Sequence, residues 1–309
     1  MATVGIDVGG TKALGIAVVD GEVVAEDRVP SPPKGDQLLD ALAVLTAELG
    51  QAAGEAVTAV GVGVPGLVDR EGVLRFAPNL RGCSGLDVRT GLEERAHVPV
   101  AVDNDATCAA WGEHQLGAAR GLDGVVLVTL GTGIGGGIVS GGRLQRGANG
   151  FAGEIGHMVV DPMGPPCPCG RTGCWERFAS GFGLGRLARE AAQAGKANRI
   201  VELAGGDPED VRGEHVTVAL VEDDPEAVAI MADFAWWLAL GLANLANIFD
   251  PQAFVIGGGL VECGDSLFGP ARRALAEQLD GQSVRPEVAL LPARLGLRAG
   301  AIGAALLEE

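Results

Sequence analysis

Apolar positions in the N-terminal third of the chain form short buried runs and one helical stripe. The runs at 3–8, 14–19 and 20–29 are separated by glycine turns, so each predicts a strand. Residues 36–53 place leucines three and four positions apart, which predicts an amphipathic helix. The apolar face of that helix consists of Leu38, Leu39, Leu42, Leu45 and Leu49.

Two further segments complete the first half of the chain. Residues 59–68 ("AVGVGVPGLV") predict a buried strand that runs into a loop. Residues 98–117 predict a strand that ends at Asp103, Asn104 and Asp105 and turns directly into a helix.

The order of strand, glycine turn and strand occurs again at 125–144 ("VVLVTLGTGIGGGIVSGGRL"). The second copy lies about 120 residues after the first, which is typical of one supersecondary unit used twice. We therefore expect two similar α/β halves that face each other across a cleft, a common place for a ligand. The matching positions are Gly9 with Gly131, Gly15 with Gly137, and Ile16 with Ile138.

The remaining pattern predicts helices at 180–205 and 225–249, a buried strand at 253–260 and a final helix at 297–309. The second helix is nearly long and apolar enough to span a bilayer. It contains Asp233, so a buried helix of a soluble protein explains it better.

Composition supports a soluble protein with a large core. The chain has 309 residues, 47% of them hydrophobic, and a formal net charge of −17 with a pI of about 4.6. This acidity argues against a nucleic-acid-binding or anionic-membrane surface. The chain opens directly with a strand pattern, so we expect no targeting segment and a cytoplasmic location.

The two glycine turns, "DVGGTK" and "LGTGIGGG", are candidate phosphate-binding loops, because glycine lets backbone N–H groups approach phosphate oxygens. Plain hairpin turns remain the alternative. Gly131, Gly133 and Gly136 also fit the dinucleotide-binding spacing G-x-G-x-x-G. We reject that interpretation because a strand follows, where the dinucleotide motif needs a helix.

Asp105 stands at the end of a strand, where a carboxylate could orient a nucleophilic hydroxyl and accept its proton during phosphoryl transfer. Asn104 would add amide groups suited to a polyol. A plain N-cap role for Asp105 is the alternative.

The stretch from Gly156 to Phe178 contains three of the six cysteines and a histidine. Cysteine and histidine are the ligands that zinc prefers, and a closed set of four leaves no open position for catalysis. We therefore predict a structural zinc site, with reduced, unliganded cysteines as the alternative. The four candidate ligands are His157, Cys167, Cys169 and Cys174.

With these residues in view, the chain resembles the ROK family (repressor, open reading frame, kinase) of the sugar kinase/actin/Hsp70 superfamily. It looks most like the ATP-dependent glucokinases of that family from actinobacteria. The resemblance covers nearly the whole chain and rests on motifs in one order. They are "DVGGTK", "GVGVPG", "FAPNL", "DNDATCAAWGE", "LGTGIGGGI", "GEIGH", "CPCGRTGCWE", "FDPQAFVIGGG" and "AGAIGAA".

The resemblance implies a duplicated, actin-like (ribonuclease H-like) two-domain α/β fold with an interdomain cleft. It implies a smaller N-terminal domain, 1–117 plus 297–309, and a larger one, 118–296, that holds the zinc loop. The implied reaction transfers the γ-phosphoryl group of MgATP to the 6-hydroxyl of D-glucose.

The resemblance also assigns roles to individual positions. Asp105 matches the general base, and Asp7 lies near magnesium. One ring nitrogen of His157 is expected on zinc and the other toward a sugar hydroxyl. The implied sugar-binding residues are Gly66, Asn79, Asn104, Asp105, Glu154, His157 and Glu176. The implied nucleotide-binding residues are Asp7, Gly9, Gly10, Thr11 and Lys12 in the first loop, Gly131, Thr132 and Gly133 in the second, and Gly257 and Gly258 beside the adenosine.

Several alternatives stay open at this point. The segment after Asn79 lacks a tryptophan that many relatives have, so the sugar could be mannose, fructose, N-acetylglucosamine or N-acetylmannosamine, and the donor could be polyphosphate. A non-catalytic ROK regulator is disfavoured, because the first strand begins at Thr3 with no helix-turn-helix before it. Family members are commonly dimers or tetramers, so we expect a homo-oligomer.

Overall fold

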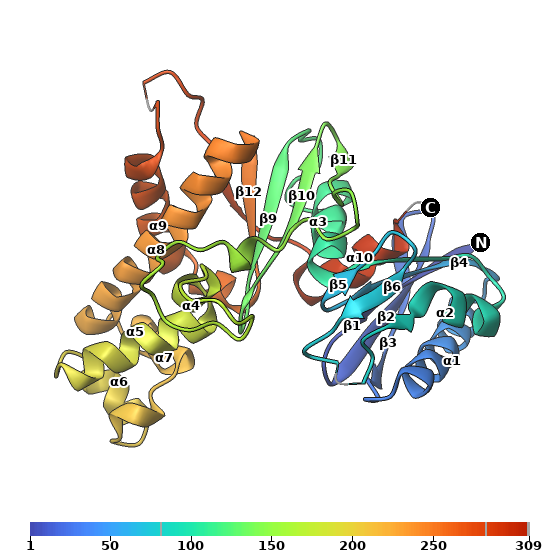
Figure 1. The fold of residues 1–309 in the computed structure, drawn as a ribbon, viewed down its shortest axis with the longest axis horizontal. Helices are drawn as coiled ribbons and strands as arrows, with labels where there is room; N and C mark the ends of the chain where they lie inside the picture. Colours follow the sequence, from blue (N-terminus) through green and yellow to red (C-terminus); the bar gives the residue numbers. More distant parts are fainter. Residues whose placement is uncertain (81, 282, 308–309) are drawn as a thin grey trace. The chain divides into compact units, whose positions relative to one another are not determined.

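The computed structural model describes residues 1–80, 82–281 and 283–307. The chain forms two compact units, here called unit 1 and unit 2 (Figure 1). Unit 1 consists of Met1–Leu127, Gly137–Gly153 and Ala293–Glu309. Unit 2 consists of Val128–Gly136 and Glu154–Pro292.

This division differs from the predicted one in the middle of the chain. The prediction assigns residues 118–127 and 137–153 to the C-terminal domain, whereas here they group with unit 1. Two of the four passages between the units fall within the strands that carry the second glycine turn, so a boundary drawn at a loop does not describe these two. The functional domain boundaries stay a prediction.

A five-stranded sheet forms the centre of unit 1, in the order β3-β2-β1-β4-β8. The pairs β1–β2 and β2–β3 are antiparallel, whereas β4 pairs in parallel with both β1 and β8. The three strands and the turn predicted at the start of the chain are confirmed. The strands are β1 Ala2–Val8, β2 Lys12–Val19, β3 Glu22–Pro30, β4 Val57–Val64 and β8 Val100–Asn104.

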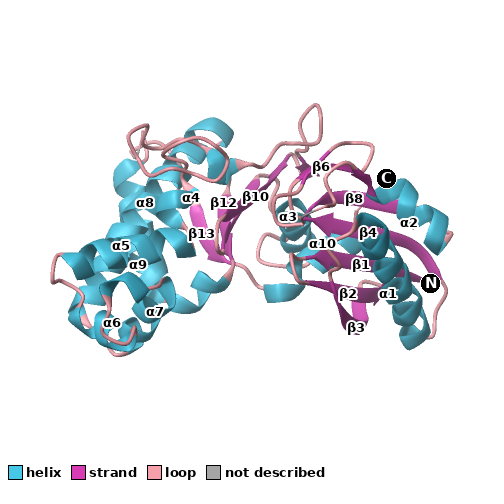
Figure 2. Ribbon diagram, turned by 60° about the horizontal axis from the view of Figure 1, so that its bottom comes forward, coloured by secondary structure: helices cyan, strands magenta, loops and turns pink. Residues whose placement is uncertain are grey.

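Helices cover both faces of this sheet (Figure 2). The predicted leucine stripe of α1 packs with Val4, Ile6 and Val62 on one face. Alternate residues of β2, among them Ile16, contact α10 on the other face, as the two-residue period of a strand requires. The helices of unit 1 are α1 Gly35–Ala53, α2 Val88–Ala96, α3 Asp105–Gln115 and α10 Ala299–Ala305, with the 3-10 turn η4 Gly296–Arg298 before α10.

Two glycines let α10 lie directly on the sheet. Gly5 and Gly61 are paired neighbours on β1 and β4. A Cβ atom at Gly5 would collide with the carbonyl oxygen of Ala301, and one at Gly61 with that of Ala304. Only glycine at both positions allows this close approach.

A small antiparallel sheet, which the sequence pattern does not predict, adds to unit 1. Its order is β5-β6-β7, and Leu74 of its central strand is fully buried. The strands are β5 Leu67–Val68, β6 Val73–Phe76 and β7 Leu86–Asp87.

The second five-stranded sheet has the order β11-β10-β9-β12-β13. Its strands therefore follow the same third-second-first-fourth-fifth order as the sheet of unit 1, which confirms the predicted repeat. The pairing β10–β11 is antiparallel and β12–β13 is parallel. The strands are β9 Val125–Leu130, β10 Ile134–Ser140, β11 Arg143–Leu144, β12 Ala253–Gly257 and β13 Ala289–Pro292.

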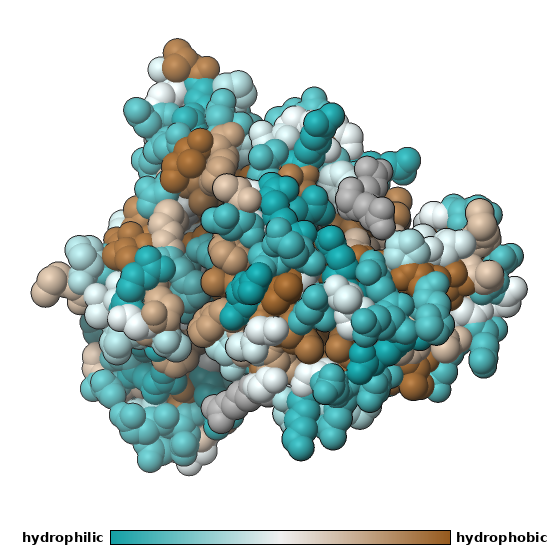
Figure 3. Space-filling view, turned by 45° about the vertical axis from the view of Figure 1, so that its right-hand side comes forward, coloured by the Kyte–Doolittle hydropathy of each residue, from teal (hydrophilic) through white to brown (hydrophobic). Residues whose placement is uncertain are grey.

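Unit 2 is rich in helices. They are α4 Glu176–Ala179, α5 Gly181–Gln193, α6 Asn198–Leu203, α7 Gly213–Val221, α8 Pro225–Phe249 and α9 Asp265–Gln278, with 3-10 turns η1 Ile155–His157, η2 Pro208–Asp210 and η3 Gly259–Cys263. Helix α8 is long and apolar enough to cross a membrane by length and composition alone. It buries Phe234, Leu238 and Leu242 within the protein, which is the behaviour of a core helix. Hydrophilic side chains are spread over the face drawn in Figure 3.

Candidate active site and metal-binding loop

Strand β8 ends at Asn104 and helix α3 begins at Asp105. The N-cap of α3 is Asn104, whose Oδ1 accepts hydrogen bonds from the N–H groups of Ala106 (2.9 Å) and Thr107 (3.1 Å). The capping role that the sequence left open for Asp105 therefore belongs mainly to its neighbour. Asp105 also accepts from Ala106 N–H (2.8 Å), and the positive end of the helix dipole stabilises its negative charge.

Asn104 also fixes the turn that precedes β5. Its Nδ2 donates to the carbonyl oxygen of Gly66 at 3.2 Å. Gly66 has φ +121°, and a Cβ atom there would collide with the carbonyl of Phe76, so this turn requires glycine. Asn79 is exposed, and its backbone lies beside Gly10 of the first glycine turn. Unit 1 thus brings Gly66 and Asn104 into direct contact.

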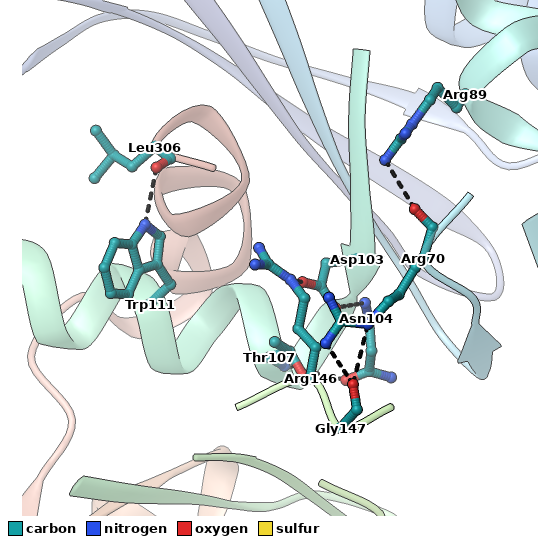
Figure 4. Close-up of polar contacts among 9 residues, drawn as sticks. All are labelled: Arg70, Arg89, Asp103, Asn104, Thr107, Trp111, Arg146, Gly147 and Leu306. Carbon is teal, nitrogen blue, oxygen red and sulfur yellow. Dashed lines mark hydrogen bonds and ion pairs between the residues drawn. The ribbon is translucent and has the colours of Figure 1, made fainter. Parts of the chain in front are cut away.

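A buried ion pair lies next to these residues (Figure 4). Asp103 is 4% exposed and pairs with Arg146. Burial raises the pKa of the Asp103 carboxyl, while the charge and hydrogen bond of Arg146 act against that rise. Arg70 donates from Nε to the carbonyl oxygen of Gly147 at 3.0 Å. Together these contacts fasten the loop after β11 to the end of β8 and to the turn between β5 and β6, a connection that no local sequence pattern predicts.

The first glycine turn joins β1 to β2 and is closed by a hydrogen bond from Gly9 N–H to the carbonyl of Lys12 (2.9 Å). Asp7 lies just before it. Burial, and then the negative charge of Asp105, raise the pKa of Asp7 to about 7. A Cβ atom at Gly300 would lie 2.7 Å from the Asp7 carboxylate, so glycine at the start of α10 leaves space for it. The exposed residues of the turn are Gly10, Thr11 and Lys12.

The second glycine turn joins β9 to β10. Gly131 N–H donates to the carbonyl of Gly133 at 3.1 Å, and Gly181 N–H donates to the carbonyl of Gly131 at 2.8 Å. Thr132 is exposed at the tip. Because β10 follows the glycines, the dinucleotide-binding interpretation is excluded, as predicted. A Cβ atom at Gly133 would lie 2.6 Å from Oε2 of Glu176.

The glycines after β12 lie against the end of β9. Gly257 is the last residue of β12, and Gly258 follows with φ +84°. A Cβ atom at Gly258 would collide with the backbone of Leu130. Unit 2 therefore places Gly258 directly beside the strand that carries the second glycine turn.

The donor atoms of the cysteine loop fit a four-coordinate zinc ion. One donor atom from each of the four predicted residues lies within 4.8 Å of all the others. The Sγ atoms of Cys169 and Cys174 are 3.5 Å apart, and Cys167 Sγ is 3.7 Å from His157 Nδ1. Tetrahedral zinc with bonds of about 2.0–2.3 Å separates its ligand atoms by about 3.6–3.8 Å. The donor set therefore fits zinc in both chemistry and spacing, with Nδ1 as the histidine donor.

Backbone contacts and a buried tryptophan hold this loop. Cys167 N–H donates to the carbonyl of Arg171 at 2.8 Å. Trp175 is 0% exposed, and its Nε1 donates to the carbonyl of Trp237 in α8 at 2.9 Å. A Cβ atom at Gly241 would collide with the Trp175 ring. Helix α8 thus supports the end of the loop.

Two carboxylates flank the histidine of the loop. His157 Nε2 lies 3.8 Å from Glu154 Oε2, and Nδ1 lies 3.6 Å from Glu176 Oε1. Cys167 Sγ is 3.0 Å from the same oxygen of Glu176. Burial raises the pKa of Glu154, and the charge of Glu176 adds to that rise. The three polar residues that the resemblance assigns to sugar binding in this part of the chain are therefore neighbours.

Comparison with known proteins identifies the family. The sequence model of the ROK family matches residues 3–309. A glucokinase of Streptomyces coelicolor is 40% identical over 99% of this chain and 97% of its own length. The crystal structure of a ROK family glucokinase from Streptomyces griseus in complex with glucose and AMPPNP is also 40% identical. It covers 99% of this chain and 98% of its own, with a TM-score of 0.84.

The family match alone does not define an activity. A xylose repressor of Bacillus subtilis is 31% identical over 97% of this chain, which spans 75% of that repressor. The fold predicted from the sequence, a duplicated actin-like two-domain sugar kinase fold, is confirmed by the structural likeness. By sequence and by structure, the chain belongs to the ROK family.

Proposed function

We propose that this protein is an ATP-dependent glucokinase, which converts MgATP and D-glucose to glucose 6-phosphate and ADP. The observation that carries the proposal is 40% identity to a glucokinase over nearly the full length of both chains. The position of Asp105 at the start of α3, beside the cap residue Asn104, supports it.

Asp105 is the general base of this proposal. Its carboxylate accepts the proton of the glucose 6-hydroxyl as the oxygen attacks the γ-phosphorus, and the bond to the leaving ADP breaks. Asn104, held by Gly66, donates the second N–H of its Nδ2 to a neighbouring sugar hydroxyl, since its Oδ1 already caps α3. A base fixed by its helix needs no rearrangement at the moment of transfer, which lowers the barrier.

Glu154, His157, Glu176 and the exposed Asn79 complete the sugar-binding set. Zinc, when bound by His157 and the three cysteines, supplies a fixed anchor for the loop and no open coordination position. The His157 ring then keeps Nε2 for a sugar hydroxyl, since Nδ1 faces the cysteine thiols.

The glycine turns Gly9–Lys12 and Gly131–Gly133 bind the phosphates of ATP through backbone N–H groups. Gly257 and Gly258 line the adenosine side. Asp7 is the carboxylate that would contact the magnesium ion that accompanies ATP, because it lies at the end of β1 next to the first turn.

Replacing the base tests the proposal directly. The Asp105→Asn variant should lose about 100- to 10,000-fold in kcat, the usual contribution of a general base. Glucose binding, measured by calorimetry, should persist, because the amide keeps the size of the side chain. An Asp105→Asn enzyme with wild-type turnover would refute the assignment.

A sugar kinase with another substrate is the nearest alternative. ADP release should be measured across glucose, mannose, fructose, N-acetylglucosamine and N-acetylmannosamine, with ATP and with polyphosphate as donors. Glucose with ATP should give the highest kcat/KM. A higher kcat/KM for any other combination of sugar and donor would leave phosphoryl transfer as the reaction but assign the enzyme a different substrate.

We further propose that the enzyme acts in the cytoplasm as a homo-oligomer without nucleic-acid or membrane partners. The net charge of −17 supports the absence of a DNA-binding role. A gel-shift with the protein's own upstream DNA tests the regulator alternative, and light scattering tests the oligomer.

A further inference from the structure

Glu113 is a fully buried carboxylate in the last turn of α3, the helix that begins with Asp105. Its side chain is 0% exposed. Oε1 accepts hydrogen bonds from the N–H groups of Arg294 (2.8 Å) and Leu295 (2.7 Å). Oε2 accepts from the N–H group of Ala118 at 2.7 Å. A buried carboxylate with this many donors is strongly fixed, because an unpaired ion there would be very costly.

The donors of Glu113 belong to two segments of unit 1 that are distant in the sequence. Ala118 lies on the loop that leads from α3 to the passage after Leu127. Arg294 and Leu295 follow directly after the passage that enters unit 1 at Ala293. One carboxylate therefore joins both segments to the same turn of α3.

Other residues of α3 fasten the same region. A ring nitrogen of His114, Nε2, is 2.9 Å from the carbonyl oxygen of Leu122, on the loop before β9. Gly137 is the first residue of another return into unit 1, and a Cβ atom there would collide with Ala110 and lie 2.9 Å from the carbonyl of Ala106. Segments before or after three of the four passages thus contact α3.

The remaining passage, between Gly153 and Glu154, follows the loop that Arg146 fastens to Asp103. Figure 4 shows this pair beside the start of α3. At its far side α3 is fixed to the end of α10, since Trp111 Nε1 donates to the carbonyl of Leu306 at 2.8 Å.

We propose that Glu113 is a positioning residue that holds these two segments and the helix of the base together as one rigid piece. Its three accepted hydrogen bonds hold the last turn of α3 in place, and through the rigid helix they set the position of Asp105. This inference rests on the proposed function, because it concerns turnover by Asp105. Glu113 itself lies two turns from the base and touches no substrate.

The Glu113→Gln variant tests this role. Glutamine has the shape of glutamate but carries an NH₂ group in place of one carboxylate oxygen. This group cannot accept from the backbone N–H groups, so the hydrogen bonds of that oxygen are lost. We expect kcat to fall about 100-fold, the usual effect of a small misplacement of a catalytic group. The glucose dissociation constant, measured by calorimetry, should change less than about threefold, because ground-state binding does not require the positioned base. Glu113→Asp, which keeps the charge, should recover part of the loss.

A destabilising substitution far from α3 provides the matched control. Leu42→Ala removes a buried side chain from α1 in the same unit. It should lower the melting temperature while kcat stays within about twofold, as expected for independent sites. A Glu113→Gln enzyme with a lowered melting temperature and a kcat within about twofold of wild type would overturn the proposal, because that is a structural role alone.

A second variant covers the case in which Glu113→Gln does not fold. A Cβ atom at Gly117 would collide with Oε2 of Glu113, so Gly117→Ala displaces the carboxylate without removing it. The same fall in kcat is expected, and normal turnover would contradict the role of Glu113. Absence of glucose-dependent ADP release in the wild-type enzyme would instead refute the proposed function.

Discussion

The carboxylates of Asp7 and Asp105 are electrostatically coupled within unit 1. Burial and the negative charge of Asp105 hold the pKa of Asp7 at about 7, far above its ordinary value. Asp7, next to the first glycine turn, therefore binds a proton in the ligand-free enzyme at mildly acidic pH. Asp7 lies near the end of β1 and Asp105 directly follows β8, and these are the two outer strands of the parallel half of the sheet.

This coupling predicts a pH-dependent stability. Because folded Asp7 binds its proton more tightly than unfolded Asp7, the contribution of Asp7 to the stability of the ligand-free enzyme falls as pH rises from about 4 to about 7. Asp7→Asn cannot ionise, so it should melt at a higher temperature than wild type at pH 8 and differ less at pH 5. Parallel melting curves for the two proteins across this range would contradict the raised pKa of Asp7. Asp105→Asn removes the neighbouring negative charge, so the midpoint of this pH dependence should move below pH 7.

Arg146→Ala should destabilise unit 1. It leaves Asp103 buried without its cation, and breaking a buried pair costs about 3–5 kcal/mol. The loss in unfolding free energy should lie near the lower end of this range, because the Arg146 side chain is partly exposed. Denaturant titration followed by circular dichroism measures the change.

The exposed pair of Arg95 and Asp40, also in unit 1, is the control for that experiment. Arg95→Ala should cost less than about 1 kcal/mol, as surface pairs do. Equal losses for the two variants would mean that the burial of Asp103 has no energetic consequence.

Cys169→Ser should lower the zinc content and raise the KM for glucose, because the anchored loop carries Glu154, His157 and Glu176. Turnover at saturating glucose should fall less than glucose affinity, since Asp105 lies on another element. Metal analysis of wild type and variant, alongside initial rates, checks both parts. Stoichiometric absence of zinc from active wild-type protein would refute the site.

Two glycines of the second glycine turn should respond differently to alanine. At Gly133 the new Cβ would lie 2.6 Å from Glu176 Oε2, so this carboxylate must shift and the KM for glucose should rise. At Gly131 nothing lies within 4 Å of the added atom, so the glucose KM should stay near wild type. Identical glucose KM values for the two variants would show that Glu176 takes no part in sugar binding.

Local signals in the sequence predict much of this molecule. Strands β1 to β3, helices α1, α3 and α8, and the repeated sheet follow from periodicity and glycine turns. The four metal-binding candidates all lie in the segment 156–178, so their short separation in the sequence is enough to bring them together. The roles assigned to individual sugar- and nucleotide-binding residues stay predictions.

Other features depend on partners that are distant in the sequence, and no local pattern reveals them. Arg146 meets Asp103 only after β10 and β11 have formed, and Glu113 meets its donors at Arg294 and Leu295 only after the chain has returned from unit 2. Helix α9 escaped prediction for another reason, because Pro270 in its interior interrupts the helical signal.

The packing of α10 on Gly5 and Gly61 also orders events during synthesis. The surface formed by these glycines stays uncovered until Ala301 and Ala304 have left the ribosome. The segment Glu154–Pro292 emerges before that point and can collapse as a body of its own. Unit 1, which starts to form first, is therefore the last to complete its core. Translation that stops before α10 leaves one face of the sheet of unit 1 uncovered, and such a chain is a substrate for proteases.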